Sequence, residues 1–162
     1  MTLAVGDKLP SATFVEMGPE GPREVDAASV FAGRRVAFFG LPGAYTGVCS
    51  TRHIPSFIRV APALREKGID EIVCIAVNDP FVLGAWGEAT GATEAGIRLL
   101  GDAGSDFVRA IGLEFSNPSR GFHNRSKRYA ALAEDGVVKV LNVEANPGAC
   151  ELSGGEALLE AI

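Results

Sequence analysis

The chain has 162 residues, of which 47% are hydrophobic and 22% are charged, and these values exclude an intrinsically disordered protein. Fifteen Lys and Arg residues against twenty Asp and Glu residues give a net charge of −5, which argues against non-specific binding to nucleic acid. No apolar run approaches the roughly 18 residues that a membrane-spanning helix needs, so we expect no membrane association. The length predicts a single domain over residues 1–162.

The first ten residues contain no basic stretch followed by a long apolar stretch. We therefore expect no secretory signal and a cytoplasmic protein. The chain has three cysteines, Cys49, Cys74 and Cys150, which is a small and odd number for a framework of structural disulfides. In a reducing compartment this favours free thiols, some of them reactive.

Short apolar runs separated by turn residues predict alternating strands and helices over the first two thirds of the chain. In chain order the sequence predicts a strand over 36–40, a turn-rich loop over 42–47, a helix over 48–67, a strand over 71–77, a helix from Pro80, a strand over 97–100 and a short helix over 105–111. Two prolines inside the first helix, Pro55 and Pro62, predict a kink or an interruption there.

The last third of the chain begins with two β-rich runs, 128–134 and 137–143, that are joined by Asp-Gly and predict a hairpin with a type I′ turn. Ser153 followed by Glu156 predicts a capping box at the start of a C-terminal helix. This order of elements favours a parallel core with antiparallel strands at one side. We therefore expect an α/β protein with a thioredoxin-like fold, in which a mixed central β-sheet is flanked by helices on both faces.

Cys49 is the first candidate for chemistry, because it follows a predicted strand and loop and stands at the start of a helix. Unpaired N–H groups and the positive end of the helix dipole favour a thiolate there, which is the reactive form of cysteine. Position alone leaves a second reading open, in which Cys49 is a small buried core residue. Thr46 favours a reactive Cys49, since the Thr46 hydroxyl could turn onto the sulfur or onto a bound oxygen. The hydroxyl could also bond its own backbone in a turn.

His53 lies one helical turn after Cys49 and could assist the thiol, but we expect it to pack on the flank of the helix. The same two residues could be half of a metal site. No second Cys/His pair follows at ligand spacing, so we expect no metal. Gly43 and Gly47 are not followed by the Gly-Lys-Ser/Thr of a phosphate-binding loop, and we expect no cofactor.

The string Pro-Gly-Ala-Tyr-Thr-Gly-Val-Cys over 42–49 resembles the active-site motif of the peroxiredoxins, Pro-x-x-x-Thr/Ser-x-x-Cys. Its surroundings resemble the atypical two-cysteine branch, or type II, which includes the mammalian mitochondrial/peroxisomal form and the plant forms. Matching segments run over nearly the whole chain, at 6–10, 39–44, 51–55, 74–82, 126–129 and 141–144. The resemblance implies a thiol-dependent peroxidase that reduces hydrogen peroxide and organic hydroperoxides without metal, haem or flavin.

The resemblance also implies roles for four residues. Cys49 would be the peroxidatic cysteine, which attacks the terminal oxygen of a hydroperoxide and becomes a sulfenic acid. Thr46 would hydrogen-bond the thiolate and the peroxide, and Pro42 would shield the new sulfenic acid from water. Arg128 would place a fixed positive charge beside the sulfur and the peroxide oxygens, although Arg125 could compete for this role by composition alone.

A second cysteine would condense with the sulfenic acid to form a disulfide. We favour Cys150, which lies in a turn-rich loop after the hairpin and resembles the resolving cysteine of the mammalian form. Cys74 lies in a predicted buried strand and reads as an inert core residue, but the plant forms use the equivalent position. If neither resolves, a small thiol or glutaredoxin would reduce the sulfenic acid directly.

The resemblance implies recycling by thioredoxin, or by glutaredoxin with glutathione, and a homodimer formed through the active-site edge. Two alternatives to the peroxidase stay open. One is a cysteine hydrolase or transferase in which Cys49 acts with His53 or His123. The other is a non-catalytic redox sensor or binding module on the same fold. A general disulfide oxidoreductase is disfavoured because the sequence has no Cys-x-x-Cys.

Overall fold

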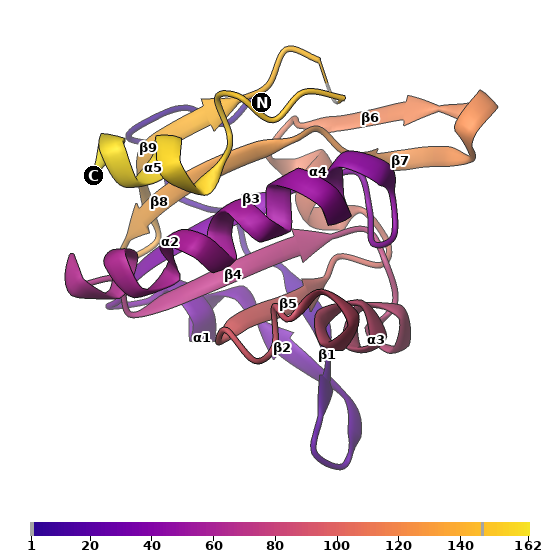
Figure 1. The fold of residues 1–162 in the computed structure, drawn as a ribbon, viewed down its shortest axis with the longest axis horizontal. Helices are drawn as coiled ribbons and strands as arrows, with labels where there is room; N and C mark the ends of the chain where they lie inside the picture. Colours follow the sequence, from indigo (N-terminus) through magenta and orange to yellow (C-terminus); the bar gives the residue numbers. More distant parts are fainter. Residues whose placement is uncertain (1, 147) are drawn as a thin grey trace.

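The computed structural model describes residues 2–146 and 148–162, and its centre is a seven-stranded β-sheet (Figure 1). The strand order is β2-β1-β5-β4-β3-β8-β9. These strands are β1 (Thr13–Gly18), β2 (Gly21–Asp26), β3 (Arg35–Gly40), β4 (Glu71–Ala76), β5 (Ile97–Gly101), β8 (Tyr129–Glu134) and β9 (Val137–Val143). The α-helices are α1 (Ala27–Phe31), α2 (Ile54–Glu66), α3 (Pro80–Thr90), α4 (Asp106–Ala110) and α5 (Gly155–Ala161).

The sheet is mixed, as the sequence predicts. Strand β4 pairs in parallel with β3 and β5, which form the parallel core. Strand β8 pairs antiparallel with β3, and β9 pairs antiparallel with β8, so the predicted hairpin lies at one side of that core. The two residues of its turn, Asp135 and Gly136, have φ values of 50° and 74°, as a type I′ turn requires.

Helices cover both faces of the sheet, which confirms the predicted architecture. One buried cluster contains Phe39 of β3 and side chains of α2, α3 and α5. The other contains Phe38 of β3 and side chains of α1 and α4. Adjacent strand residues point to opposite faces, so these two phenylalanines serve different cores. No helix in the described part of the chain is long and apolar enough to cross a membrane.

Two hairpins were not predicted from the sequence. One is the β1–β2 pair at the edge of the sheet. The other is a separate two-stranded sheet of β6 (Glu114–Asn117) and β7 (Phe122–Ser126), joined by a 3₁₀ turn, η2 (Pro118–Arg120). Figure 1 shows β6 and β7 as an arm that extends beyond the main sheet. This arm is largely polar and partly exposed, so it lacks the alternating apolar pattern that marks a strand.

The predicted capping box is wrong. Helix α5 begins at Gly155, and its N-cap residue, Gly154, makes no side-chain cap. The Ser153 hydroxyl instead donates to Glu144 Oε2 over 2.7 Å. Glu156, the other half of the predicted box, pairs with Arg59 of α2 over 2.8 Å.

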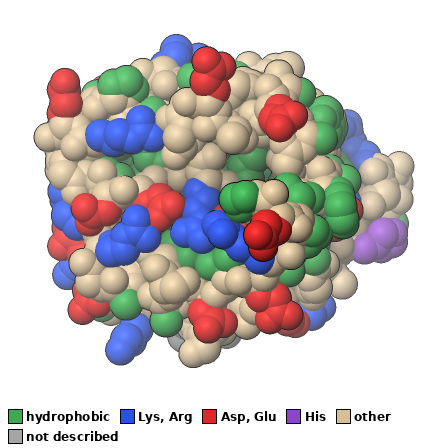
Figure 2. All heavy atoms as spheres, turned by 90° about the horizontal axis from the view of Figure 1, so that it is seen from below, with side chains coloured by type: hydrophobic (Ala, Val, Ile, Leu, Met, Phe, Trp, Pro, Cys, Tyr) green, Lys and Arg blue, Asp and Glu red, His purple; other side chains and the backbone are tan. Residues whose placement is uncertain are grey.

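On the face shown in Figure 2, basic and acidic groups lie next to one another rather than gathered by sign. Ion pairs also join neighbouring strands of the sheet: the nearly buried Glu16 of β1 pairs with Arg23 of β2 and Arg98 of β5, at 2.9 Å and 2.7 Å.

Candidate active site

Cys49 begins a π-helical turn, η1 (Cys49–His53), that leads directly into α2. The turn is wide because the Ile54 N–H bonds to the Cys49 carbonyl five residues earlier rather than four. Pro55 follows and lacks an N–H, so it could not extend the usual hydrogen-bond pattern backward from α2. The predicted helix over 48–67 and its interruption are therefore confirmed, whereas Pro62 lies inside α2 and the helix continues past it.

The loop between β3 and the π turn, which we call the active-site loop, is held from two sides. Arg125 of β7 donates from Nη1 to the Pro42 carbonyl over 2.9 Å. The Ala44 N–H donates to Asn78 Oδ1, which follows β4, also over 2.9 Å. Gly43 has a φ of 155°, and a Cβ at this position would collide with the Arg125 guanidinium. Arg125 therefore contacts the loop, and the guanidinium that contacts the Cys49 sulfur is that of Arg128.

The Thr46 hydroxyl donates to the Gly43 carbonyl over 2.7 Å. Its proton is therefore engaged within the loop, as in the turn-residue reading of the sequence. The oxygen keeps its lone pairs and can still accept a hydrogen bond from a molecule in the adjoining pocket.

Arg128 lies immediately before β8 and is almost completely buried, with 1% of its surface exposed. Its Nη2 donates to the Cys49 sulfur over 3.2 Å, and its Nη1 lies 3.0 Å from His53 Nδ1. A guanidinium stays protonated and has only donors, so it interacts more favourably with a thiolate than with a thiol. The geometry thus places a fixed positive charge beside the Cys49 sulfur.

His53 is a buried hydrogen-bonding residue, so the expectation that it merely packs on the helix flank is wrong. Its Nδ1 must accept from Arg128, and its Nε2 must therefore carry the proton that is donated to the Ser153 carbonyl over 2.9 Å. Burial, and then the charge of Arg128, lower the pKa of His53 from 6.5 to about 3. The ring is neutral at physiological pH. Its spacing of one turn from Cys49 was the available signal in the sequence.

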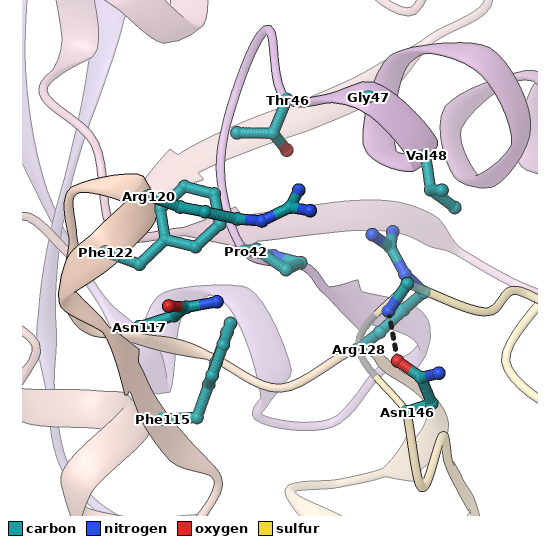
Figure 3. Close-up of a pocket in the computed structure, with 11 residues that line it drawn as sticks. Pro42, Thr46, Gly47, Val48, Phe115, Asn117, Arg120, Phe122, Arg128 and Asn146 are labelled. Atoms are coloured by element: carbon teal, nitrogen blue, oxygen red, sulfur yellow. Dashed lines mark hydrogen bonds between the residues drawn. The ribbon is translucent and has the colours of Figure 1, made fainter.

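A pocket of about 330 Å³ opens between the active-site loop and the β6–β7 arm (Figure 3). In Figure 3 the Arg120 side chain reaches from the arm toward the space between Thr46 and Pro42, and Phe115 and Phe122 form an aromatic wall. Arg128 also lines the pocket, and Cys49, which is fully buried, lies immediately behind it. The full lining comprises Pro42, Thr46, Gly47, Val48, Phe115, Asn117, Arg120, Phe122, Arg128, Asn146 and Gly148.

The three cysteines are free thiols in the structure. Cys74 lies fully buried on β4, where burial, and then the neighbouring Cys49, raise the pKa of its thiol well above the ordinary value. Cys150 is half-buried in the segment before α5, beside Thr51 and Arg52 of the π turn. Burial raises the pKa of the Cys150 thiol, and Arg128 opposes this increase.

The Redoxin family model matches residues 4–159. A relative from rice, peroxiredoxin-2E-2 of the chloroplast, is 46% identical over 99% of this chain and 73% of its own length. The chain belongs to the peroxiredoxin family. Peroxiredoxin-2B of Arabidopsis thaliana is 37% identical over 99% of this chain and 98% of its own. The structure of reduced Prx3 from Vibrio vulnificus in complex with H2O2 superposes with a TM-score of 0.91, at 42% identity over 99% of both chains.

This peroxiredoxin is a thiol-dependent peroxidase with a thioredoxin-like fold, as the sequence resemblance implies. The alternative of a hydrolase or transferase finds no support in its geometry. His53 accepts from Arg128, and His123 lies exposed on the β6–β7 arm. Within residues 2–146 and 148–162, no three His, Cys, Asp or Glu side chains come together as metal ligands.

Proposed function

We propose that Cys49 is the peroxidatic cysteine of this peroxidase and that Arg128 is its catalytic partner. The observation that carries this proposal is the hydrogen bond from Arg128 Nη2 to the Cys49 sulfur, made in a fully buried position at the wall of the pocket. No other cysteine of the described chain receives such a bond from a guanidinium. The pocket beside it is large enough for a hydroperoxide with an organic substituent.

The reaction follows from these contacts. The Cys49 thiolate attacks the terminal oxygen of the hydroperoxide, so that a sulfur–oxygen bond forms while the oxygen–oxygen bond breaks. The sulfur is oxidised to a sulfenic acid, and the departing oxygen leaves as an alkoxide or hydroxide that takes a proton from water. Negative charge moves from sulfur to the departing oxygen, and a preorganised guanidinium stabilises it at both places.

Thr46 and Pro42 complete the proposed site. The free lone pairs of Thr46 Oγ1 can accept the hydrogen of the hydroperoxide and orient its oxygen–oxygen bond toward the sulfur. Pro42 lies on the pocket wall, where its ring excludes water from the new sulfenic acid. Arg125, through the Pro42 carbonyl, holds this wall in place.

We propose Cys150 as the resolving cysteine. It lies next to the π turn that Cys49 begins, it is only half-buried, and its segment contains no regular element before α5. Cys74 is less suited because it is held inside the central strand β4 with no exposed surface. Movement of a surface segment costs less than movement of a central strand.

We propose a homodimer and recycling by thioredoxin or by glutaredoxin with glutathione, and membership of the family supports both. The cytoplasmic location expected from the sequence stays a prediction. Sedimentation of the reduced protein tests the dimer. Peroxide turnover with each purified reductant tests the electron donor, and fractionation of cells tests the location.

The decisive experiment oxidises the fully reduced protein with one equivalent of hydrogen peroxide and maps its cysteine peptides without reduction. A rapid Cys49–Cys150 disulfide supports both assignments, and the Cys150→Ser variant should then stop at a Cys49 sulfenic acid. A Cys49–Cys74 disulfide would move the resolving role, and Cys74→Ser is the matched control. If Cys49 oxidises no faster than the other two thiols, the assignment of Cys49 fails.

A further inference from the structure

A continuous chain of hydrogen bonds runs from the Cys49 sulfur to Glu144, which lies after β9. Arg128 bonds the sulfur and His53, and His53 bonds the Ser153 carbonyl. Ser153 is in turn fixed by the Glu144 carboxylate. We propose that Glu144 is a positioning residue for the peroxide reaction, acting on Arg128 through the Ser153 backbone and His53. This inference rests on the proposed role of Cys49.

Glu144 is built into the structure as an anchor. Only 4% of its surface is exposed, and a single oxygen, Oε2, accepts from the Leu152 N–H, the Ser153 N–H and the Ser153 hydroxyl, at 2.8, 2.6 and 2.7 Å. Its own N–H donates to the Arg128 carbonyl over 2.9 Å. Bonds to an ionised carboxylate are about twice as strong as those between neutral groups. The carboxylate therefore binds the C-terminal segment to the strand end that carries Arg128.

The position of the Ser153 carbonyl decides the state of His53. Arg128 can only donate, so His53 Nδ1 must be the acceptor and Nε2 must hold the proton. That Nε2–H is buried and needs an acceptor, which Ser153 supplies. If the carbonyl moved away, the Nε2–H would lose its partner inside the core. The ring would then turn or change tautomer, and Arg128 would lose one of the contacts that orient its guanidinium.

The same segment carries Cys150, three residues before Ser153. Cys49 and Cys150 are both free thiols in the structure, and a disulfide between them can form by movement of this segment, of the π turn, or of both. Release of the segment would break the Ser153 contacts and loosen Arg128 after the peroxide step is complete. The site that attacks peroxide is thus fully assembled only while the segment with Cys150 and Ser153 keeps its contacts with His53 and Glu144.

The experiment compares Glu144→Gln with Glu151→Gln, which removes the same charge from an exposed residue next to Cys150. The rate constant for oxidation of Cys49 by hydrogen peroxide is measured in a single turnover. We expect a fall of about tenfold for Glu144→Gln and less than twofold for Glu151→Gln, since weakening the anchor misplaces Arg128. Equal rates for the two variants would overturn the proposal.

A double-mutant cycle with His53→Gln separates positioning from general loss of structure. The amide nitrogen of glutamine can replace Nε2–H. Its carbonyl oxygen is attached one atom farther along the side chain than Nδ1, so it does not offer Arg128 an acceptor in the same place. If Glu144 acts through His53, Glu144→Gln adds less than a twofold loss in the His53→Gln background. A full tenfold loss there would mean that Glu144 acts by another route and would overturn the proposal.

Nitrogen NMR of the imidazole provides a readout that does not depend on activity. The wild-type protein should show His53 with its proton on Nε2, and Glu144→Gln should show a mixture of tautomers or a mobile ring. This result would stand even if Cys49 proved slow toward peroxide, so failure of the peroxidatic assignment remains distinguishable. A wild-type proton on Nδ1, or an unchanged His53 signal in Glu144→Gln, would overturn the inference.

Discussion

The indole N–H of Trp86 donates to the Ser50 hydroxyl over 2.9 Å, and this bond ties α3 to the turn that carries Cys49. Trp86 is fully buried, and it is the only tryptophan of the chain. Ser50 is the residue directly after Cys49. Any unwinding of the π turn must therefore change the surroundings of a single fluorescent side chain.

We predict that oxidation of Cys49 changes the emission of Trp86. One equivalent of hydrogen peroxide, mixed rapidly with the reduced protein, should give a first phase whose rate is proportional to peroxide concentration. A slower phase, independent of peroxide, should follow as the turn opens to form the disulfide. The Cys150→Ser variant should lose the slower phase, and Cys49→Ser should lose both. Fluorescence that stays constant while mass spectrometry records a disulfide would contradict the prediction.

Replacement of Arg128 by Lys should lower the rate constant of Cys49 with peroxide by about 10²- to 10³-fold. An ammonium group keeps the charge but lacks the planar fork that contacts Cys49 and His53 together. Stopped-flow oxidation of the reduced variant measures this effect. Arg109→Lys, on the exposed side of α4, is the control and should react as the wild type. A rate for Arg128→Lys within threefold of the wild type would rule out the proposed role.

Gly40→Ala should destabilise the fold by about 1–3 kcal/mol, because an added methyl group would overlap the buried Tyr129 ring beside it. Gly40 is the last residue of β3, directly before the active-site loop. Urea unfolding followed by circular dichroism gives the free energy of unfolding. Gly47→Ala is the matched control, since a Cβ there meets nothing within 4 Å, and it should leave that free energy unchanged or increase it. Equal effects of the two substitutions would count against this packing.

The stability contributed by His53 should decline as the pH falls. Its pKa is about 3 in the folded chain against 6.5 as the ordinary value, so the unfolded chain binds more protons between these two pH values. The contribution is complete above the higher value and is lost progressively below it. Between about pH 7.5 and about pH 5.5, the advantage of the wild type over His53→Gln should shrink by about 1.4 kcal/mol.

Urea unfolding of both proteins at the two pH values measures this difference. His123→Gln is the control, because it makes the same replacement at an exposed histidine on the β6–β7 arm, outside the core. An advantage over His53→Gln that stays constant with pH would show that His53 is not held neutral by burial.

The predicted elements that proved right are those whose signals are local. The parallel strands β3 and β4 appear as short apolar runs, and the Asp135-Gly136 turn follows from its own two residues. The β6–β7 arm could not be found in this way, since its strands are largely polar and partly exposed and lack the alternating apolar pattern of a strand. The capping box failed because the carboxylate of Glu144 competes for the Ser153 hydroxyl from nine residues earlier.

The candidate site was predictable where a motif defines it. The spacing from Pro42 to Cys49 locates the loop and the thiol, and the segment around Arg128 supplies its partner. The partners of Arg128 could not be predicted, since a histidine one turn along a helix is usually a packing residue. His53 gained its role from a backbone carbonyl 100 residues away, at Ser153. Such contacts arise only when the whole chain is folded.

The π turn at Cys49 holds one residue more than an α turn spanning the same rise. The bond from Ile54 to the Cys49 carbonyl closes it, and the α pattern is re-established from Pro55 onward. Opening of the π turn therefore need not unwind α2. The extra residue of the turn can leave the helical path while the Phe57 ring of α2 stays stacked on Phe39 of β3. The distance that the Cys49 sulfur can move is then limited by the length of the five-residue segment Cys49–His53, because the start of α2 stays in place.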